Sequence, residues 1–370
     1  MNVAREAGTA ILNSITILRA IAALAVVIYH VQHMLASSPA QAESISKLGA
    51  AGVDLFFVIS GFIMMYVSFN LFETKGAGLA FLKNRFVRIA PTYYLFTTLT
   101  IAILLFFPSL YGQLRFSLTQ AISSYLFLFS RNNVGEIGMV VGVGWTLAFE
   151  AFFYLLFAVL LMLPRNWCLP ALATLFSAGF ISGQIWDIDA AWAMVITNPL
   201  TFEFLFGCLI GLAFRKGFQI SRWKSTAVIV GGVLALLITA QLDLFDGDFG
   251  ELRFLVFGVP AAAIVIGAVS LERSLGRLPL PRILKRIGDS SYSMYLGHQY
   301  VLAAIAAVIV PRMWDGYVIL VAVATLSVVL CVVAGVCCFL LFERPVTQVL
   351  RRRWLRHPKI SATQVQRDLV

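Results

Sequence analysis

Long apolar runs, separated by short polar segments, dominate the chain as far as about residue 342. A transmembrane helix needs ~20 mainly apolar residues. Ten runs approach this length, so the pattern predicts ten membrane spans. They cover residues 11–34, 49–72, 89–109, 139–163, 168–185, 193–213, 225–242, 252–271, 291–311 and 316–342. The apolar residues 121–129 are too few to span, and we expect them to re-enter the membrane or lie at its surface.

The composition agrees with this pattern, because 60% of the 370 residues are hydrophobic and only 12% are charged. Soluble domains carry roughly 25% charged residues. Between the spans there is no room for another domain. We therefore expect an all-α, polytopic transmembrane helix bundle, with residues 1–345 as one domain and residues 346–370 as a basic cytoplasmic tail.

Lys and Arg are unevenly distributed, as expected if they accumulate on cytoplasmic loops. With the amino terminus inside, only five of the 28 fall on outer loops, namely Lys47, Arg115, Arg131, Arg253 and Arg312. Both termini are then cytoplasmic. The net charge of +10 comes from the inner loops and the tail. A basic segment beside a membrane favours binding to anionic lipid, so the bilayer and not nucleic acid is the expected partner.

Two other patterns bear on the class of protein. The five cysteines lie in or beside apolar spans without metal-ligand spacing, so neither disulfides nor a metal site is predicted. Arg19, the apolar run after it and residues 40–42 (AQA) imitate a secretory signal with its cleavage site. We expect an uncleaved first span, because this run contains His30 and a second span follows at once.

The first span carries a cation and an imidazole, Arg19 and His30. A charge inside the bilayer costs at least ~2.5 kcal/mol, so such a residue suggests a functional site. Eleven positions at about 100° each bring the helix roughly 20° past three turns, which places both side chains on one face. The alternative is that Arg19 snorkels to the cytoplasmic interface and His30 is a hydrogen-bonded core residue.

Four further ionisable residues lie inside predicted spans. Asp54 has a depth similar to that of His30 and could fix its tautomer, or cap its own helix. Glu150 and Glu203 lie within spans four and six, where a carboxyl group must be protonated, paired or in contact with water. His298, near the cytoplasmic face, could line the route of a cytoplasmic cofactor or bond a backbone carbonyl.

Arg85 and Arg88 lie three positions apart at the inner end of the third span and so share a helical face. Two guanidinium groups so placed can hold phosphate oxygens, although they could also be ordinary positive-inside charges. Pro91 predicts a break between this segment and the span, and Pro345 predicts the end of the tenth span.

Two function classes use a buried polar axis with a basic inner mouth. One is an enzyme that moves a group from a phosphorylated cytoplasmic donor to an acceptor outside. The other is a proton-coupled transporter or flippase of a sugar or glycolipid. Transporters of this size often contain repeated halves with interrupted helices, and this sequence shows no such internal symmetry. The pattern therefore favours the enzyme.

Five motifs closely resemble the acyltransferase-3 family, and in particular its bacterial exopolysaccharide O-acetyltransferases. The resemblance covers residues 11–345. The motifs are Arg19 followed after ten residues by His30, then GVDLFFVISGF at 52–62, RFVRIAP at 85–91, WTLAFE at 145–150 and SYSMYLGH at 291–298. Thr146 stands where the family often has Ser, which keeps the hydroxyl group.

The resemblance implies a multi-pass enzyme of the bacterial inner membrane. Such an enzyme transfers an acyl group, usually acetyl, from cytoplasmic acyl-coenzyme A to a hydroxyl of an exported or cell-surface polysaccharide or glycolipid. His30 would be the catalytic histidine, and Arg85 and Arg88 would lie near the donor. The full set expected at the substrates is Arg19, Arg85, Arg88, Trp145, Ser60, Glu203, Tyr292 and His298, with His30, Asp54 and Glu150 catalytic.

In the expected mechanism, His30 removes the acceptor proton while Asp54 or Glu150 orients its ring. An acyl-histidine intermediate is an open alternative. A succinyl or longer acyl donor fits the sequence as well as acetyl does. So does an acceptor in lipopolysaccharide, peptidoglycan, a glycolipid or an antibiotic. We also expect a homodimer and contact with polysaccharide export machinery.

Overall fold

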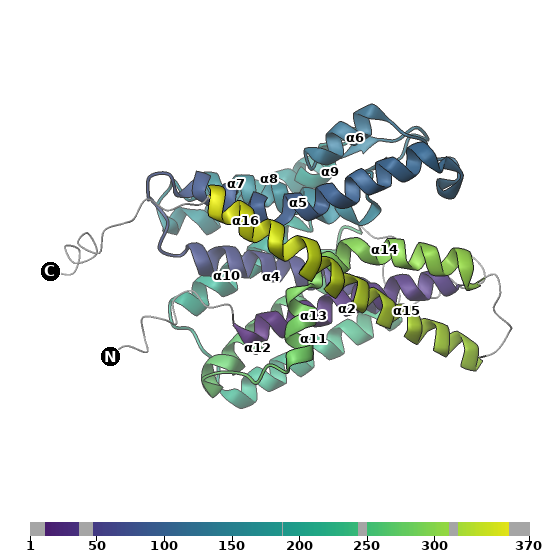
Figure 1. Ribbon diagram of the computed structural model, residues 1–370. Helices are drawn as coiled ribbons and strands as arrows, with labels where there is room; N and C mark the ends of the chain where they lie inside the picture. Colours follow the sequence, from purple (N-terminus) through teal and green to yellow (C-terminus); the bar gives the residue numbers. More distant parts are fainter. Residues whose placement is uncertain (1–11, 37–46, 187, 243–249, 311–316, 355–370) are drawn as a thin grey trace.

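A computed structural model describes residues 12–36, 47–186, 188–242, 250–310 and 317–354 of the chain (Figure 1). Helices make up about four fifths of these residues. The strands in this part of the chain are two residues long, β1 (Ser130–Arg131) and β2 (Ile137–Gly138), which pair antiparallel. The prediction of an all-α membrane protein is therefore confirmed.

Each predicted span corresponds to a helix in the structure. The long helices are α2 (Asn13–Leu35), α4 (Ala51–Ser68), α5 (Ala77–Phe106), α7 (Trp145–Leu160), α8 (Arg165–Ile185), α10 (Thr201–Arg215), α11 (Arg222–Leu242), α12 (Val259–Leu275), α14 (Ser291–Val308) and α15 (Tyr317–Cys338). Among the described residues, eight helices are long and apolar enough to cross a membrane. The other two predicted spans fall short because α10 has only 15 residues and α14 begins with a polar half.

Shorter elements connect or extend these helices. They are η1 (Lys47–Ala50), η2 (Pro108–Tyr111), α6 (Leu118–Tyr125), η3 (Gly142–Gly144), α9 (Ala193–Ile196), η4 (Phe254–Gly258), α13 (Arg282–Asp289), η6 (Phe339–Glu343) and α16 (Arg344–Trp354). Helix α6 occupies most of the apolar segment that was predicted to be too short to span. It lies beside the C-terminal half of α5 (Figure 1).

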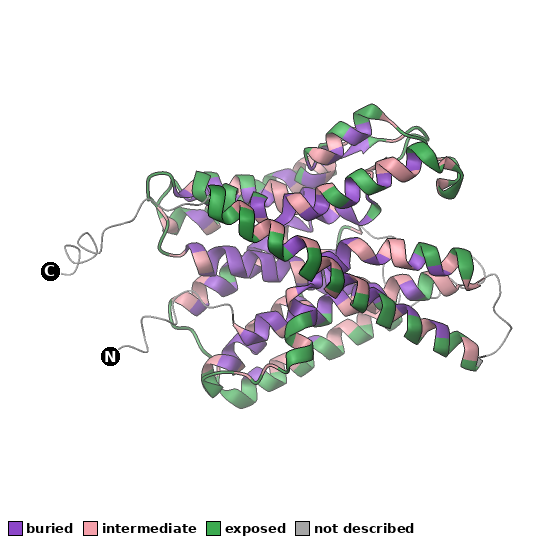
Figure 2. Ribbon diagram, in the orientation of Figure 1, coloured by how far each residue is buried: buried purple, intermediate pink, exposed green. Residues whose placement is uncertain are grey.

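Helix α4 runs through the middle of the bundle, and most of its residues are buried (Figure 2). Glycines let its backbone approach two neighbouring helices closely. A Cβ atom added at Gly52 would lie 2.4 Å from the carbonyl oxygen of Ala22 in α2. One added at Gly61 would lie 2.1 Å from the carbonyl oxygen of Phe204 in α10. Small residues commonly serve this purpose in membrane bundles.

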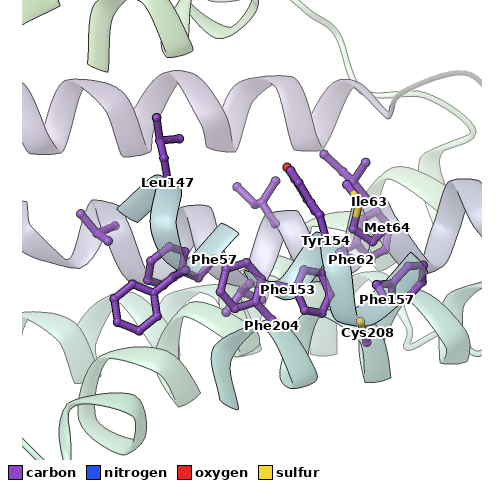
Figure 3. Packing of buried hydrophobic residues seen from close by; sticks show 14 of the residues in the cluster. Phe57, Phe62, Ile63, Met64, Leu147, Phe153, Tyr154, Phe157, Phe204 and Cys208 are labelled. Carbon is purple, nitrogen blue, oxygen red and sulfur yellow. The ribbon is translucent and has the colours of Figure 1, made fainter. Parts of the chain in front are cut away.

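Aromatic side chains fill the space between α4, α7 and α10 (Figure 3). The ring centroids of Phe153 and Phe204 are 4.5 Å apart, and those of Phe57 and Phe204 are 4.7 Å apart. Tyr154 borders this cluster, with its hydroxyl turned away from Phe153 and Phe204 (Figure 3). The cluster therefore packs α7 against α4, and the hydroxyl of Tyr154 lies on its outer side.

A carboxylate from α12 fixes the start of α2. The backbone N–H groups of Asn13 and Ser14 donate to the two carboxylate oxygens of Glu272, at 2.9 and 2.8 Å. The first N–H groups of a helix have no partner within the helix, and a negative charge there is favourable. Glu272 thus sets the position of the helix that carries Arg19 and His30.

Two expectations about proline are wrong. Pro91 lies inside one continuous helix, α5, and does not separate Arg85 and Arg88 from the span. Pro345 is the second residue of α16, and a π-helical turn, η6, connects it to α15. Proline is tolerated in the first turn of a helix, and in membrane helices whose neighbours compensate. The basic pair is consequently held by a long, rigid helix.

Helix α2 begins, and α16 ends, at the same end of the bundle (Figure 1). This arrangement agrees with termini on one side of the membrane, and the assignment of that side to the cytoplasm stays a prediction. The signal-like residues 40–42 and the tail beyond Trp354 lie outside the described residues.

The close approach of α4 and α10 makes a testable prediction. Substitution Gly61→Ala should destabilise the protein by ~1–3 kcal/mol, because the new methyl group would overlap the Phe204 carbonyl. Gly231→Ala is the matched control, since an added Cβ there meets nothing within 4 Å. Thermal unfolding in detergent should show a lower midpoint for Gly61→Ala only. Equal midpoints would contradict this packing.

Candidate active site

A cavity with an empty volume of about 750 Å³ lies between α2, α4, α5, α7 and α14. We call it the arginine cavity, because three guanidinium groups line it. Its polar lining residues include Arg19, Ser60, Arg85, Arg88, Thr146, Glu150, Tyr154, Ser291, Tyr292 and Tyr295. The structure therefore brings together six of the residues predicted from sequence, namely Arg19, Ser60, Arg85, Arg88, Glu150 and Tyr292.

Two of the three arginines, Arg19 and Arg85, are held in different ways. Arg19 donates from Nη2 to the hydroxyl of Ser291, at 2.9 Å. The guanidinium of Arg85 lies 5.3 Å from the ring centroid of Phe81 and 5.9 Å from that of Tyr154. Its buried Nε has no hydrogen-bond partner within the part of the chain that the structure describes. A buried donor of this kind is costly unless a ligand accepts from it.

Glu150 is the acidic group of this cavity. Its Oε1 accepts a hydrogen bond from Ser60 in α4, at 2.9 Å, and another from Tyr154 one turn later in α7. Tyr292 donates to the carbonyl of Ile89, at 2.7 Å, and so ties α14 to α5. These bonds fix the walls of the cavity around the arginines.

A second cavity, with an empty volume of about 600 Å³, adjoins the first. We call it the histidine cavity. Val53 and Tyr295 line both cavities. Its other lining residues are Val26, Tyr29, His30, Ala50, Gly142, Val143, Trp145, Arg253 and Gln299. His30 and Trp145 thus lie in this cavity, while Arg19 lies in the other one.

Tyr295 stands at the boundary between the cavities. Its hydroxyl donates to the carbonyl of Val143, at 3.1 Å, and accepts from Thr146, at 3.0 Å. Val143 lies in η3 and Thr146 in the first turn of α7, so the tyrosine joins α14 to the start of this helix. Its hydroxyl is thereby held at the border of the two cavities.

The hydrogen bonds of His30 define its tautomer. Its Nδ1 lies 2.9 Å from the carbonyl oxygen of Val26. A carbonyl can only accept, so Nδ1 carries the proton and Nε2 is the basic nitrogen. The backbone of its own helix therefore orients the ring.

His298 lies beside His30, with 4.8 Å between the ring centroids. Its Nδ1 bonds the carbonyl of Tyr295, at 2.7 Å. Its buried Nε2 has no partner among the described residues. Of the two alternatives left open, the backbone bond is confirmed. The imidazole is next to the candidate catalytic histidine and does not line the arginine cavity.

The expected contact of Asp54 with His30 is wrong. Both Asp54 oxygens accept from Arg253, Oδ1 from Nε at 3.0 Å and Oδ2 from Nη2 at 2.8 Å. Both side chains are almost fully buried. Asp54 therefore reaches the histidine cavity only through Arg253, which lines it. Glu150 does not orient His30 either, because its hydrogen bonds are to Ser60 and Tyr154.

Glu203 lies near the Asp54–Arg253 ion pair and lines neither cavity. Its side chain is fully buried against Gly258, where an added Cβ would lie 2.8 Å from Cγ. No described residue hydrogen-bonds its carboxyl oxygens. Asp54 and Arg253 are the charged side chains that interact with it electrostatically. The structure gives no support for a substrate contact of Glu203.

Sequence reasoning missed Arg253, Tyr295 and Gln299 as cavity residues. Arg253 was assigned to an outer loop, although a carboxylate at the depth of Asp54 needs a cation nearby. Tyr295 lies three positions before His298, which places it on the same face of α14. The spacing was therefore a usable signal for Tyr295, whereas the position of Gln299 depends on the tertiary packing.

Comparison with known proteins adds independent findings. A family model described as an acyltransferase domain matches residues 12–341. The exopolysaccharide production protein ExoZ of Rhizobium meliloti (strain 1021) is 37% identical over 265 residues, which cover 70% of this chain and 78% of the relative. No solved structure matches the chain.

Two more distant relatives are named as acyltransferases. The peptidoglycan O-acetyltransferase OatA of Listeria monocytogenes is 26% identical over 81% of this chain, and the match covers 51% of that longer protein. The acyltransferase MdmB of Streptomyces mycarofaciens is 25% identical, with 79% of each chain covered.

Loss of one partner of the buried Asp54–Arg253 pair should strongly destabilise the protein. Asp54→Ala or Arg253→Ala should each lower the free energy of unfolding by ~3–5 kcal/mol, because each leaves a buried charge unpaired. The double variant should lose less than the sum. Chemical unfolding in micelles measures the free energy of unfolding of the wild type, the two single variants and the double variant. Additive losses would contradict the pairing.

The exposed ion pair of Arg131 and Asp189 is the control for this cycle. Pairs in contact with water contribute ~0–1 kcal/mol. Removing either partner there should leave the unfolding curve nearly unchanged.

Proposed function

Since the chain belongs to the acyltransferase-3 family, we propose that it transfers an acetyl group from cytoplasmic acetyl-coenzyme A to a hydroxyl of an exported polysaccharide or glycolipid. Family membership favours this enzyme over the transporter or flippase. The observation that carries the proposal is that a cavity with three arginines adjoins a cavity with a histidine. The names of ExoZ, an exopolysaccharide production protein, and OatA, a peptidoglycan O-acetyltransferase, support a polymeric saccharide as the acceptor.

The arginine cavity suits the donor. Coenzyme A carries a diphosphate and a 3′-phosphate, and arginines bind phosphate oxygens through paired N–H groups. Arg85 has a buried donor without a partner among the described residues, and Arg88 lies one turn further along the same helix. We assign both to the donor phosphates. Arg19, fixed by Ser291, would then hold the donor arm between its phosphates and the thioester.

The histidine cavity suits a sugar. Its lining combines the aromatic rings of Tyr29 and Trp145 with the amide of Gln299. Flat aromatic faces cover the apolar face of a sugar ring, while an amide both donates to and accepts from its hydroxyls. An acceptor here would place a hydroxyl beside His30.

The chemistry follows from the position of the basic nitrogen. Nε2 of His30 takes the proton of the acceptor hydroxyl, and the alkoxide oxygen attacks the thioester carbonyl. The bond from the carbonyl carbon to sulfur then breaks. The proton on Nε2 passes to the departing thiolate, so the histidine returns to its first state. His298 and Tyr295 would keep the imidazole in place.

The boundary at Val53 and Tyr295 is where donor and acceptor would meet. With the termini inside, the arginine cavity would receive the donor from the cytoplasm and the histidine cavity the acceptor from the outer side. An inner-membrane location, a homodimer and contact with export machinery stay predictions within this proposal.

The role of His30 can be tested directly. His30→Ala should reduce O-acetylation of cell polysaccharide by ~10²- to 10⁴-fold, because a general base contributes about that much to the rate. Mass spectrometry of polysaccharide from cells that express each variant measures the acetyl content. The amount of inserted protein and its thermal midpoint should not change.

The matched control is His33→Ala, one turn later in α2. His33 makes the same kind of Nδ1 bond to a backbone carbonyl, that of Tyr29 at 3.0 Å, but its side chain is exposed. It should retain full activity. Normal acetylation by His30→Ala would disprove the assignment.

A further inference from the structure

Helix α16 carries a further arginine, Arg351, alongside the segment of α5 that bears Arg85 and Arg88. It packs against α5 (Figure 1), and the ring of Trp354 stacks on that of Phe86, with 6.2 Å between centroids and 11° between planes. Arg351 precedes Trp354 by three positions and therefore lies on the same side of α16. The stacking on Phe86 places α16 beside the turn of α5 that carries Arg85 and Arg88, whose charges repel that of Arg351.

This cluster of like charges can hold an anion, because the nearby carboxylates of Glu150 and Glu343 offset it only in part. Arg85, Arg88 and Arg351 form no ion pair with any residue in the described ranges. Repulsion among three guanidinium groups near a membrane is unfavourable, yet the stacking of Trp354 on Phe86 keeps Arg351 there. The buried Nε of Arg85, without a partner among those residues, points to a missing acceptor at the same place.

We propose that Arg351 binds the 3′-phosphate of coenzyme A and thereby makes the enzyme specific for a 3′-phosphorylated donor. This inference rests on the proposed function, which supplies the donor. From the sequence, residues 346–370 are expected only to be a basic tail that favours lipid binding. Here one residue of that segment becomes part of the donor site.

The order of charges supports this assignment. From the thioester outward, coenzyme A carries first its diphosphate and then the phosphate on the ribose. From the cavity outward, the chain offers first Arg85 and Arg88, which line the cavity, and then Arg351, which is exposed and does not. A donor with its thioester toward His30 would therefore place its last phosphate nearest Arg351.

An anionic lipid headgroup carries the same phosphate chemistry. Lipid at the membrane surface would meet Arg351, Arg352 and Arg353 alike, because all three are exposed. Successive residues of a helix point about 100° apart, so the coenzyme would distinguish Arg351 from Arg352. This difference provides a matched control with the same charge on the same helix.

The test compares the binding of two ligands to the purified full-length protein. Titration calorimetry measures Kd for acetyl-coenzyme A and for its 3′-dephospho form, with wild type, Arg351→Gln and Arg352→Gln. Wild type should bind the dephospho form about 10-fold more weakly, the loss of one charge-assisted contact. Arg351→Gln should bind acetyl-coenzyme A about 10-fold more weakly and no longer distinguish the ligands. Arg352→Gln should behave as wild type.

Other outcomes would contradict either the 3′-phosphate assignment or the proposed donor. If wild type binds both ligands equally tightly, the 3′-phosphate assignment is wrong and the proposed donor stands. If wild type binds neither ligand, the proposed donor fails, and the assignment fails with it. If Arg352→Gln weakens binding as much as Arg351→Gln, or if the effect appears only in nanodiscs that contain phosphatidylglycerol, the arginines act on lipid.

Discussion

A polar group inside a membrane must find a partner or meet water, and this constraint organises the structure. Some buried charges are fully paired within the bundle. Asp54 and Arg253 bind each other through two hydrogen bonds, and Glu272 accepts from the first N–H groups of α2. These pairs lock helices that are distant in sequence into one frame.

Other polar groups keep donors or acceptors that the described chain does not satisfy; one of them lines the arginine cavity and another lies beside the ring of His30. Arg85 Nε is one and His298 Nε2 is another. A rigid frame around them prevents a simple collapse that would pair them. The close backbone contacts at Gly52 and Gly61 and the stacked ring of Phe204 supply that rigidity. Because the residues around the site are already paired and packed, its polar atoms without a partner among the described residues can bind a ligand.

The helices and much of the arginine cavity could be predicted from sequence, because both depend on local periodicity. Arg19 and His30 line two adjoining cavities, as expected for residues on one helical face. Contacts between distant segments could not be predicted in the same way. The partner of Asp54 is 199 positions away, and the stacking of Trp354 on Phe86 joins α16 to α5. Tertiary packing alone selects such partners among several candidate charges.

The central claim is that one helix bundle joins a donor cavity and an acceptor cavity that open toward opposite sides of the membrane. The most direct measurement is the sidedness of acetyl transfer in sealed vesicles of known orientation, with labelled acetyl-coenzyme A supplied to one face and polysaccharide acceptor to the other. The claim predicts labelled acceptor only when the donor is on the face where α2 begins and α16 ends. Transfer that requires both substrates on the same face would contradict it.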